Sequence, residues 1–311
     1  MPTQPVFGLL PDERSDEVQR ILDALADGIA EVVHFGTHVF VWHNEASAGK
    51  TDEVVPVAMM FRHLLEMLDS VAAMVKVSIV EPAHLPPRSA FEASAQIEWI
   101  IQTDSDRRGM AFMVWHAHHR LKLYHQFDRA TQQGKDLASK LAGTVYDGID
   151  ASGKFDLPAA RANMEQLLAK PLYREAGREY AKLKKTRKRS PQWFQLFGGP
   201  DSIEQLAVRV GMPEWYQILY RRWSGVVHAT DVITGKISGR DGETEIHQLR
   251  WPGGVESVYT FSVSLALRTY RHLIAATMPD KQPVMRDWYA REVRPVYHKV
   301  SSSKLIADED T

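Results

Sequence analysis

The feature that most constrains this chain is the recurrence of apolar side chains at intervals of three and four residues. Between residues 12 and 43 one such stripe follows the 3.6-residue period of an α-helix: Val18, Ile21, Leu22, Leu25, Ile29, Val32 and Val33. A second stripe runs from residue 51 until Pro82 ends it. Because a helical stripe is buried only against another element, this pattern predicts an all-α fold in which several helices form a bundle.

Capping residues and prolines divide the rest of the chain into further helices. The expected helices cover residues 88–103, 105–127, 134–141, 158–185, 202–210, 213–229 and 257–276, with a last one after residue 279. Residues 231–255 differ, because glycines punctuate short pieces there that tolerate β-structure. They predict a short β-hairpin or an irregular insertion.

The expected organisation has three segments: an N-terminal helix over residues 1–49, a helical core over 50–277, and a C-terminal helix with a frayed tail over 278–311. The absence of cysteine excludes disulfides and thiolate chemistry, and a net charge of -1 gives no global attraction for nucleic acid or membrane. The N-terminus lacks the pattern of a signal peptide, and no apolar run approaches about 20 residues. We therefore expect a cytoplasmic protein without a membrane partner.

The residues best suited to chemistry lie in the segment 220–228. On a helix, a separation of seven residues returns to within about 20° of the same direction, so Arg221 and His228 share a face, with Ser224 between them. Arg222 is rotated by about 120° from His228. A guanidinium that binds phosphate and a histidine that moves protons near neutral pH suit the handling of a phosphodiester. The structural interpretation is a salt-bridged arginine and a hydrogen-bonded core histidine.

Arg88 and Glu92 are four residues apart on an otherwise apolar helix. At a surface they form an intrahelical ion pair worth about 0.5 kcal/mol or less. Their neighbours Phe91 and Ile97 indicate a buried helix, in which the pair needs partners from another helix. Arg221 or His228 are candidates for that role.

Two other patterns point to weaker hypotheses. His116, His118, His119 and His125 form a cluster, and His116 and His119 share a helical face. Because no Glu-x-x-His accompanies them, we expect a polar helix face and neither a metal nor a cofactor. Residues 44–51 are similar to a phosphate-binding P-loop, but Asn44 replaces its first glycine and no alternation of strands and helices surrounds it.

A basic run closes the helix expected at 158–185 and precedes an aromatic segment. Its residues could hold RNA through phosphate contacts and base stacking: Lys184, Lys185, Arg187, Lys188, Arg189 and Trp193. The alternative is an ordinary solvated helix end.

Three of these stretches together resemble a bacterial family catalogued as domain of unknown function five-six-seven-seven. They are the Arg88-to-Glu92 stretch with Trp99 downstream, residues 193–206, and the segment 220–228. The resemblance spans roughly residues 50–277 and implies a helical fold more than a reaction.

A wider resemblance is to the HEPN superfamily of helical bundles, whose ribonucleases carry an arginine, four to six arbitrary residues and a histidine. It implies metal-independent cleavage of RNA at a homodimer interface, in the role of a toxin or phage-defence effector. His228 would then transfer the proton, Arg221 would stabilise charge on the phosphate, and Arg88, Glu92 and Ser224 would support the pair. The competing hypothesis is a helical interaction module without catalysis, in which the same polar residues form a structural network. No pattern identifies the substrate or a cognate inhibitor.

Overall fold

The computed structural model describes residues 6, 8–10, 14–48, 51–147, 156–187, 189–227, 230, 232–234, 236–240 and 243–302. The chain forms two compact units, one from residues 1–103 and 203–311 and the other from residues 104–202. The second unit is therefore an insertion in the first. The three segments expected from the sequence group the chain differently, since both terminal segments belong to the same unit as much of the middle one.

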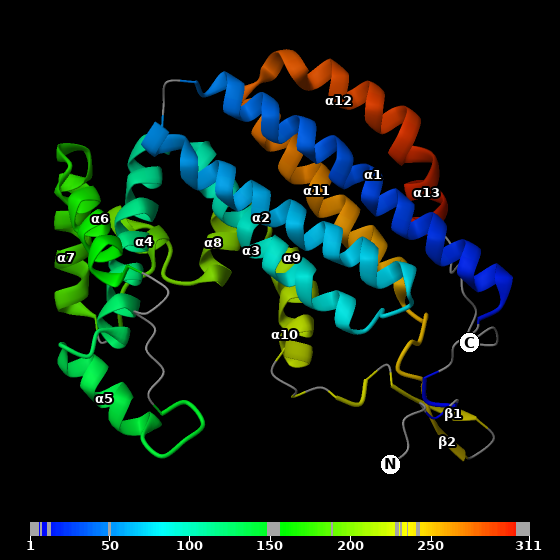
Figure 1. The fold of residues 1–311 in the computed structure, drawn as a ribbon. Coiled ribbons are helices and arrows are strands. Elements are labelled where there is room, and N and C mark those ends of the chain that lie inside the picture. Colours follow the sequence, from blue (N-terminus) through cyan, green and yellow to red (C-terminus); the bar gives the residue numbers. More distant parts are fainter. Residues whose placement is uncertain are drawn as a thin grey trace. The chain divides into compact units, whose positions relative to one another are not determined.

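Four long helices form the centre of the first unit: α1 (Asp16–Ala46), α2 (Thr51–Lys76), α3 (Leu85–Gln102) and α11 (Val255–Thr277). Helix α1 packs on α2 and α11, and α3 packs on the same two helices, so that the four enclose one core (Figure 1). The side chains of the predicted stripes are buried in it, Leu22, Ile29, Leu64 and Leu68 among them. The expected multi-helix bundle is confirmed.

Local signals set the ends of these helices. Ser15 caps α1 by accepting a hydrogen bond from the backbone N–H of Val18, so the helix begins later than residue 12. Helix α3 begins at Leu85, earlier than expected, because Pro86 and Pro87 occupy its first turn, where their missing N–H groups cost nothing. Residues 38–43 form the last turns of α1, so no strand precedes the segment that is similar to a P-loop.

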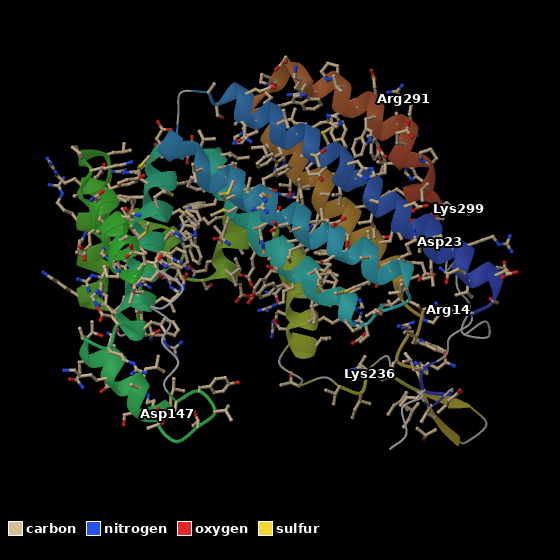
Figure 2. The ribbon with its side chains drawn as sticks, viewed as in Figure 1. Arg14, Asp23, Asp147, Lys236, Arg291 and Lys299 are labelled. Atoms are coloured by element: carbon tan, nitrogen blue, oxygen red, sulfur yellow. The ribbon has the colours of Figure 1, made fainter. Side chains whose placement is uncertain are left out.

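Shorter elements complete the first unit. They are η1 (Pro82–His84), α8 (Ile203–Arg209), α9 (Pro213–Trp215), the π-helical turn η5 (Tyr216–Tyr220), α10 (Arg221–Val227), η6 (Pro279–Lys281), α12 (Gln282–Trp288), the π-helical turn η7 (Tyr289–Val293) and α13 (Arg294–Ser302). Side chains of Arg291 and Lys299 project from the outer face of the C-terminal segment (Figure 2). Strands β1 (Ile237–Arg240) and β2 (Glu243–Ile246) pair antiparallel, which confirms the expected hairpin.

Gly36 allows α1 to approach its neighbours closely. A Cβ atom at this position would overlap the Tyr270 hydroxyl and the Leu65 side chain. The Tyr270 hydroxyl donates a hydrogen bond to the Val32 carbonyl oxygen at 3.0 Å, and the added methyl group would disturb that bond.

We expect Gly36→Ala to lower the free energy of unfolding by about 1–3 kcal/mol, because a packed core does not absorb an added methyl group. Urea denaturation followed by circular dichroism measures this. Gly177→Ala is the matched control, since nothing lies within 4 Å of a Cβ there, and alanine in a helix interior is neutral or stabilising. Equal stability of wild type and Gly36→Ala would contradict this account of the packing.

The second unit is built around α4 (Ser105–Phe127). Packed on α4 are α5 (Gln132–Leu141), α6 (Leu157–Ala169), η3 (Pro171–Tyr173), α7 (Arg174–Thr186) and η4 (Trp193–Gly198). The single helix expected over 158–185 is wrong, because Pro171 interrupts it and separates α6 from α7. In the part of the chain that the structure describes, no helix is long and apolar enough to cross a membrane.

Candidate functional site

A hydrogen-bonded network joins α3 to the turn that precedes α10. Arg88 donates a hydrogen bond from Nη2 to the Tyr220 hydroxyl at 2.9 Å, and this hydroxyl donates to Glu92 Oε1 at 2.8 Å. The Arg88 guanidinium also lies over the Tyr220 ring, 4.5 Å from its centroid. The direct distance from Arg88 Nη2 to Glu92 Oε1 is 3.8 Å. Tyr220 is thus the partner from another helix that the Arg88–Glu92 pair was expected to need.

Packing and electrostatics fix the Tyr220 side chain. It is buried between Phe91 of α3 and Tyr216, with ring centroids 5.5 and 5.0 Å away. Burial, reinforced by the neighbouring Glu92 carboxylate, raises the pKa of Tyr220 to about 12. The phenol therefore keeps its proton at neutral pH and serves as a donor to Glu92. It is the last residue of a π-helical turn, a feature often found at functional sites.

Arg221 follows Tyr220 directly and opens α10. Its side chain is exposed, and its Nη1 donates a hydrogen bond to Gln217 Oε1 at 3.0 Å. Arg222 is exposed as well, while Ser224 is half-buried. His228 lies outside the described residues, so its pairing with Arg221 stays a prediction. Arg221 was a candidate partner of the Arg88–Glu92 pair, and this expectation is wrong, because Tyr220 is the partner and Arg221 bonds to Gln217.

His84, a histidine that sequence reasoning missed, lies beside α10 in the first unit. His84 ends η1, with its Nδ1 3.0 Å from the Glu81 carbonyl oxygen and its ring centroid 5.4 Å from that of Trp223. Burial lowers the pKa of His84, Glu81 opposes this shift, and Arg222 adds to it. Its position between the apolar ends of α2 and α3 gave no sequence signal of its proximity to α10.

Another network missed in the sequence joins α3 to α11. Glu98 is only 1% exposed. Its Oε1 and Oε2 each accept a hydrogen bond from Arg268 at 2.8 Å, and His272 Nδ1 lies 2.8 Å from Oε2. Arg268 also donates to the Val210 carbonyl oxygen at 2.8 Å. Two sequence signals were available. Glu98 is an acidic residue between Ile97 and Ile100, and Arg268 and His272 are basic residues four positions apart. With its lone pairs occupied inside the bundle, Glu98 has a structural role.

The Tyr220 hydroxyl offers a test of the network that leaves ring packing unchanged. We expect Tyr220→Phe to lower the free energy of unfolding by about 1–2 kcal/mol, because it removes two hydrogen bonds to charged partners. Tyr216→Phe is the matched control, since it makes the same change one turn earlier, where the hydroxyl has no hydrogen bond to any residue that the structure describes. Urea denaturation measures both variants. Equal losses in the two would mean that the bridge to Arg88 and Glu92 adds no stability.

The described residues of the basic run in the second unit differ in their surroundings. Lys184, Lys185 and Arg189 are exposed, whereas Arg187 forms an ion pair with Asp201. Lys188 lies outside the described residues. The phosphate contacts of Lys184 and Lys185 stay a prediction.

Trp193 requires a correction. It is 1% exposed, and its ring packs on Phe112 and Phe194, with centroids 5.7 and 5.9 Å away. The predicted stacking of an RNA base on Trp193 is therefore wrong, because the side chain is buried among aromatic residues of the second unit. Among the described residues, no three histidine, aspartate or glutamate side chains are grouped so that they could hold a metal ion.

Comparison with known families places these residues in a wider context. The Family of unknown function (DUF5677) has a sequence model that matches residues 54–244, more than half of the chain. The chain belongs to this family. The part matched to DUF5677 contains Arg88, Glu92 and Tyr220, as well as the whole second unit. A search of the curated proteins and a search of the solved structures each gave no match. The expected family is thus confirmed, while the HEPN resemblance stays a prediction.

Proposed function

We propose that this DUF5677 protein is a metal-independent endoribonuclease, with Arg221 and His228 as its catalytic pair. The observation that carries the proposal is the fixed start of α10. Arg88 and Glu92 both hydrogen-bond to the Tyr220 hydroxyl, and the next residue, Arg221, is exposed to solvent. A catalytic side chain needs such a rigid backbone support together with free access for the substrate.

The proposed chemistry uses two groups. His228 removes the proton from the ribose 2′-hydroxyl, whose oxygen attacks the adjacent phosphorus atom and displaces the 5′-oxygen of the next nucleotide. The leaving oxygen takes up a proton from water and His228 returns its proton to water, so the products are a 2′,3′-cyclic phosphate and a 5′-hydroxyl. Arg221 stabilises the negative charge that develops on the non-bridging oxygens.

The remaining residues of the site support this pair. Arg88 and Glu92 position Tyr220 and hence the first turn of α10, and Ser224 lies one turn after Arg221 on the same helix. The HEPN resemblance extends the proposal to a homodimer and to a role as a toxin or phage-defence effector.

RNA cleavage by the purified full-length protein tests the proposal. Single-stranded and hairpin RNAs of varied sequence are incubated with the protein in the presence of a metal chelator, and the product ends are analysed. The proposal expects cleavage with 2′,3′-cyclic phosphate ends. Intact RNA after prolonged incubation with folded protein would sink it, and so would cleavage that stops when chelator is added.

The Arg88–Tyr220–Glu92 bridge also favours a second candidate, a helical interaction module without catalysis. In that case the bridge serves only to lock α10 against α3, and its residues matter for stability alone. Removal of Arg221, which is exposed, then changes neither stability nor any RNA-dependent property. Cleavage by wild type and by Arg221→Ala distinguishes the two candidates, and unfolding curves of the variant verify that it is folded.

A further inference from the structure

The pocket between α4 and α7 in the second unit has the composition of a binding site for an anion. Its volume is about 410 Å³, within the usual range for small-ligand sites. Two lysines and three histidines line it, and none of its described lining residues is acidic: Trp115, His118, His119, Leu121, Lys122, His125, Gln133, Tyr180, Lys184 and Ser190. Positive charge gathered in a concave site attracts anions more strongly than the same charge on an open helix.

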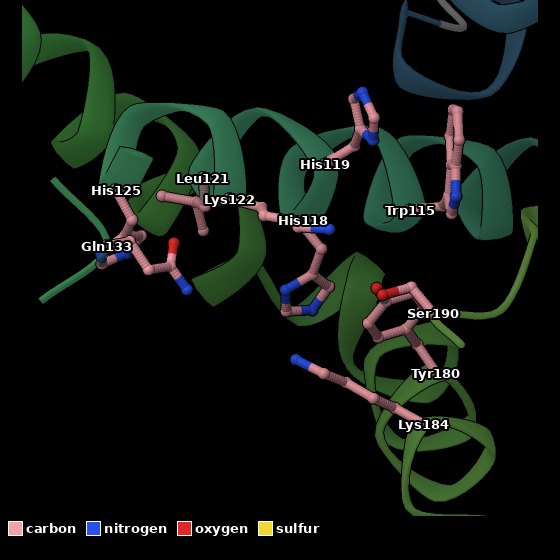
Figure 3. Close-up of a pocket in the computed structure, with 10 residues that line it drawn as sticks. All are labelled: Trp115, His118, His119, Leu121, Lys122, His125, Gln133, Tyr180, Lys184 and Ser190. Atoms are coloured by element: carbon pink, nitrogen blue, oxygen red, sulfur yellow. The ribbon is translucent and has the colours of Figure 1, made fainter. Parts of the chain in front are cut away.

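The two helices hold the polar groups in a defined arrangement. His118 of α4 stacks on Tyr180 of α7, with ring centroids 4.4 Å apart and an angle of 8° between the planes. Tyr180 is hydrogen-bonded to Ser190. Lys184 follows Tyr180 by one helical turn, and Figure 3 shows its ammonium group extended toward the His118 ring. The histidine is thus fixed in place, while the lysine reaches into the space beside it.

Aromatic surface accompanies this charge. Trp115 is half-buried at the edge of the pocket and stacks on His119, with ring centroids 5.3 Å apart. Basic groups that bind phosphates and rings that pack on bases are the two components of sites for single-stranded nucleic acid. Trp115, unlike the buried Trp193, is placed to supply the ring.

We propose that the α4–α7 pocket binds a phosphate group of single-stranded RNA, with Lys184 and His118 as its ligands and a neighbouring base packed on Trp115. This inference rests on the proposed function, since it names where the substrate RNA is held. Its test measures binding and not cleavage, so each idea can fail separately.

The pocket assigns different roles to neighbouring residues of the basic run. Lys184 lines the pocket, whereas Lys185 is rotated by about 100° around α7 and is not among the lining residues. A diffuse basic surface would use both lysines equally. The comparison of Lys184→Ala with Lys185→Ala therefore separates a built site from a solvated helix end, with the same charge change in each.

Fluorescence anisotropy with a labelled oligouridine of about 12 nucleotides tests the site. The full-length chain carries His228→Ala in every sample, so that the RNA stays intact, and chelator is present. We expect Lys184→Ala to weaken binding by about 10-fold and to reduce the slope of log K against log salt by about one, while Lys185→Ala changes affinity by less than about 2-fold. Equal losses in both variants, or no binding by the parent protein, would overturn the proposal.

Two competitors identify the source of the phosphate. Uridine 5′-monophosphate supplies one phosphate and one base, and inorganic polyphosphate supplies charge without bases. The proposal expects the unlabelled oligouridine to displace the probe at a much lower concentration than either. If the mononucleotide competes as well as the oligonucleotide, the pocket is a nucleotide site, and if polyphosphate does, base packing has no part in it. Both results contradict the proposed recognition of single-stranded RNA.

A pH series tests the part played by His118. Burial and the nearby Lys184 lower the pKa of His118, and a bound phosphate would favour its protonated form. Affinity for RNA should therefore rise as the pH falls from about 8 to about 5.5. His118→Phe keeps a ring against Tyr180 and should lose about one proton of this dependence. The other titratable groups lining the pocket stay in place in both proteins: His119, Lys122, His125, Tyr180 and Lys184. An unchanged pH profile in His118→Phe would remove His118 from the site.

Discussion

Replacing His228 by alanine is expected to lower the rate of metal-independent RNA cleavage by about 10²–10⁴-fold, the usual contribution of a general base or acid. Arg221→Ala should lower it by about 10²–10³-fold, because a fixed charge that faces the transition state is lost. Single-turnover rates in chelator measure both effects. The unfolding curve of Arg221→Ala should match the wild type, since Arg221 is exposed and bonded only to Gln217 within the described residues.

The matched controls are Arg222→Ala and His84→Asn. Arg222 is an exposed arginine in the same turn as Arg221. His84 is a histidine near Arg222, whose charge lowers the pKa of His84. We expect each control to change the rate by less than about 5-fold. A large loss in these two proteins, with full activity in Arg221→Ala and His228→Ala, would transfer the catalytic role to the pair formed by Arg222 and His84.

The largest effect on stability should come from Glu98. Glu98→Ala leaves the Arg268 guanidinium with one carbonyl partner and His272 without its carboxylate, and both of these side chains are only partly exposed. Removal of one member of a buried ion pair costs about 3–5 kcal/mol. For a unit of this size we expect the melting temperature to fall by about 6–20 °C. Differential scanning calorimetry measures the shift.

Glu92→Ala is the matched control on the same helix. The Glu92 side chain is 39% exposed and that of Glu98 is 2% exposed, so water can replace the lost contacts at Glu92 alone. The melting temperature should fall by only a few degrees in Glu92→Ala. Equal shifts in the two variants would show that burial does not decide the strength of these networks.

The helical fold was predictable because its signal is local. The stripe that includes Leu22 and Ile29 marks the buried face of α1, and the glycines between residues 231 and 255 mark the hairpin. The break at Pro171 has an equally local cause, because a proline interrupts the helix there. The observed helix ends differ from the expected ones where two signals compete. At Leu85, prolines that end one helix also suit the first turn of the next.

The candidate site was predictable only in part. The four-residue spacing of Arg88 and Glu92 predicted a pair that needs a partner. That this partner is Tyr220 depends on the packing of α10 against α3. Sequence spacing carries no information on contacts of that range. For the same reason the Glu98 network and the meeting of His118 with Tyr180 emerged only with the fold.

The insertion of residues 104–202 between α3 and α8 has a consequence for the order of folding. The first unit must join residues 1–103 to residues 203–311, and α8 packs on α3 although about 100 residues separate them. Closing so long a flexible loop carries an entropic cost that delays long-range contacts. The inserted unit is contiguous in sequence and rich in local helix contacts, so it can collapse early and shorten the effective tether. In a chain that emerges from the ribosome, the second unit would then fold first, and α1, α2 and α3 would complete their packing only after α11 has been synthesised.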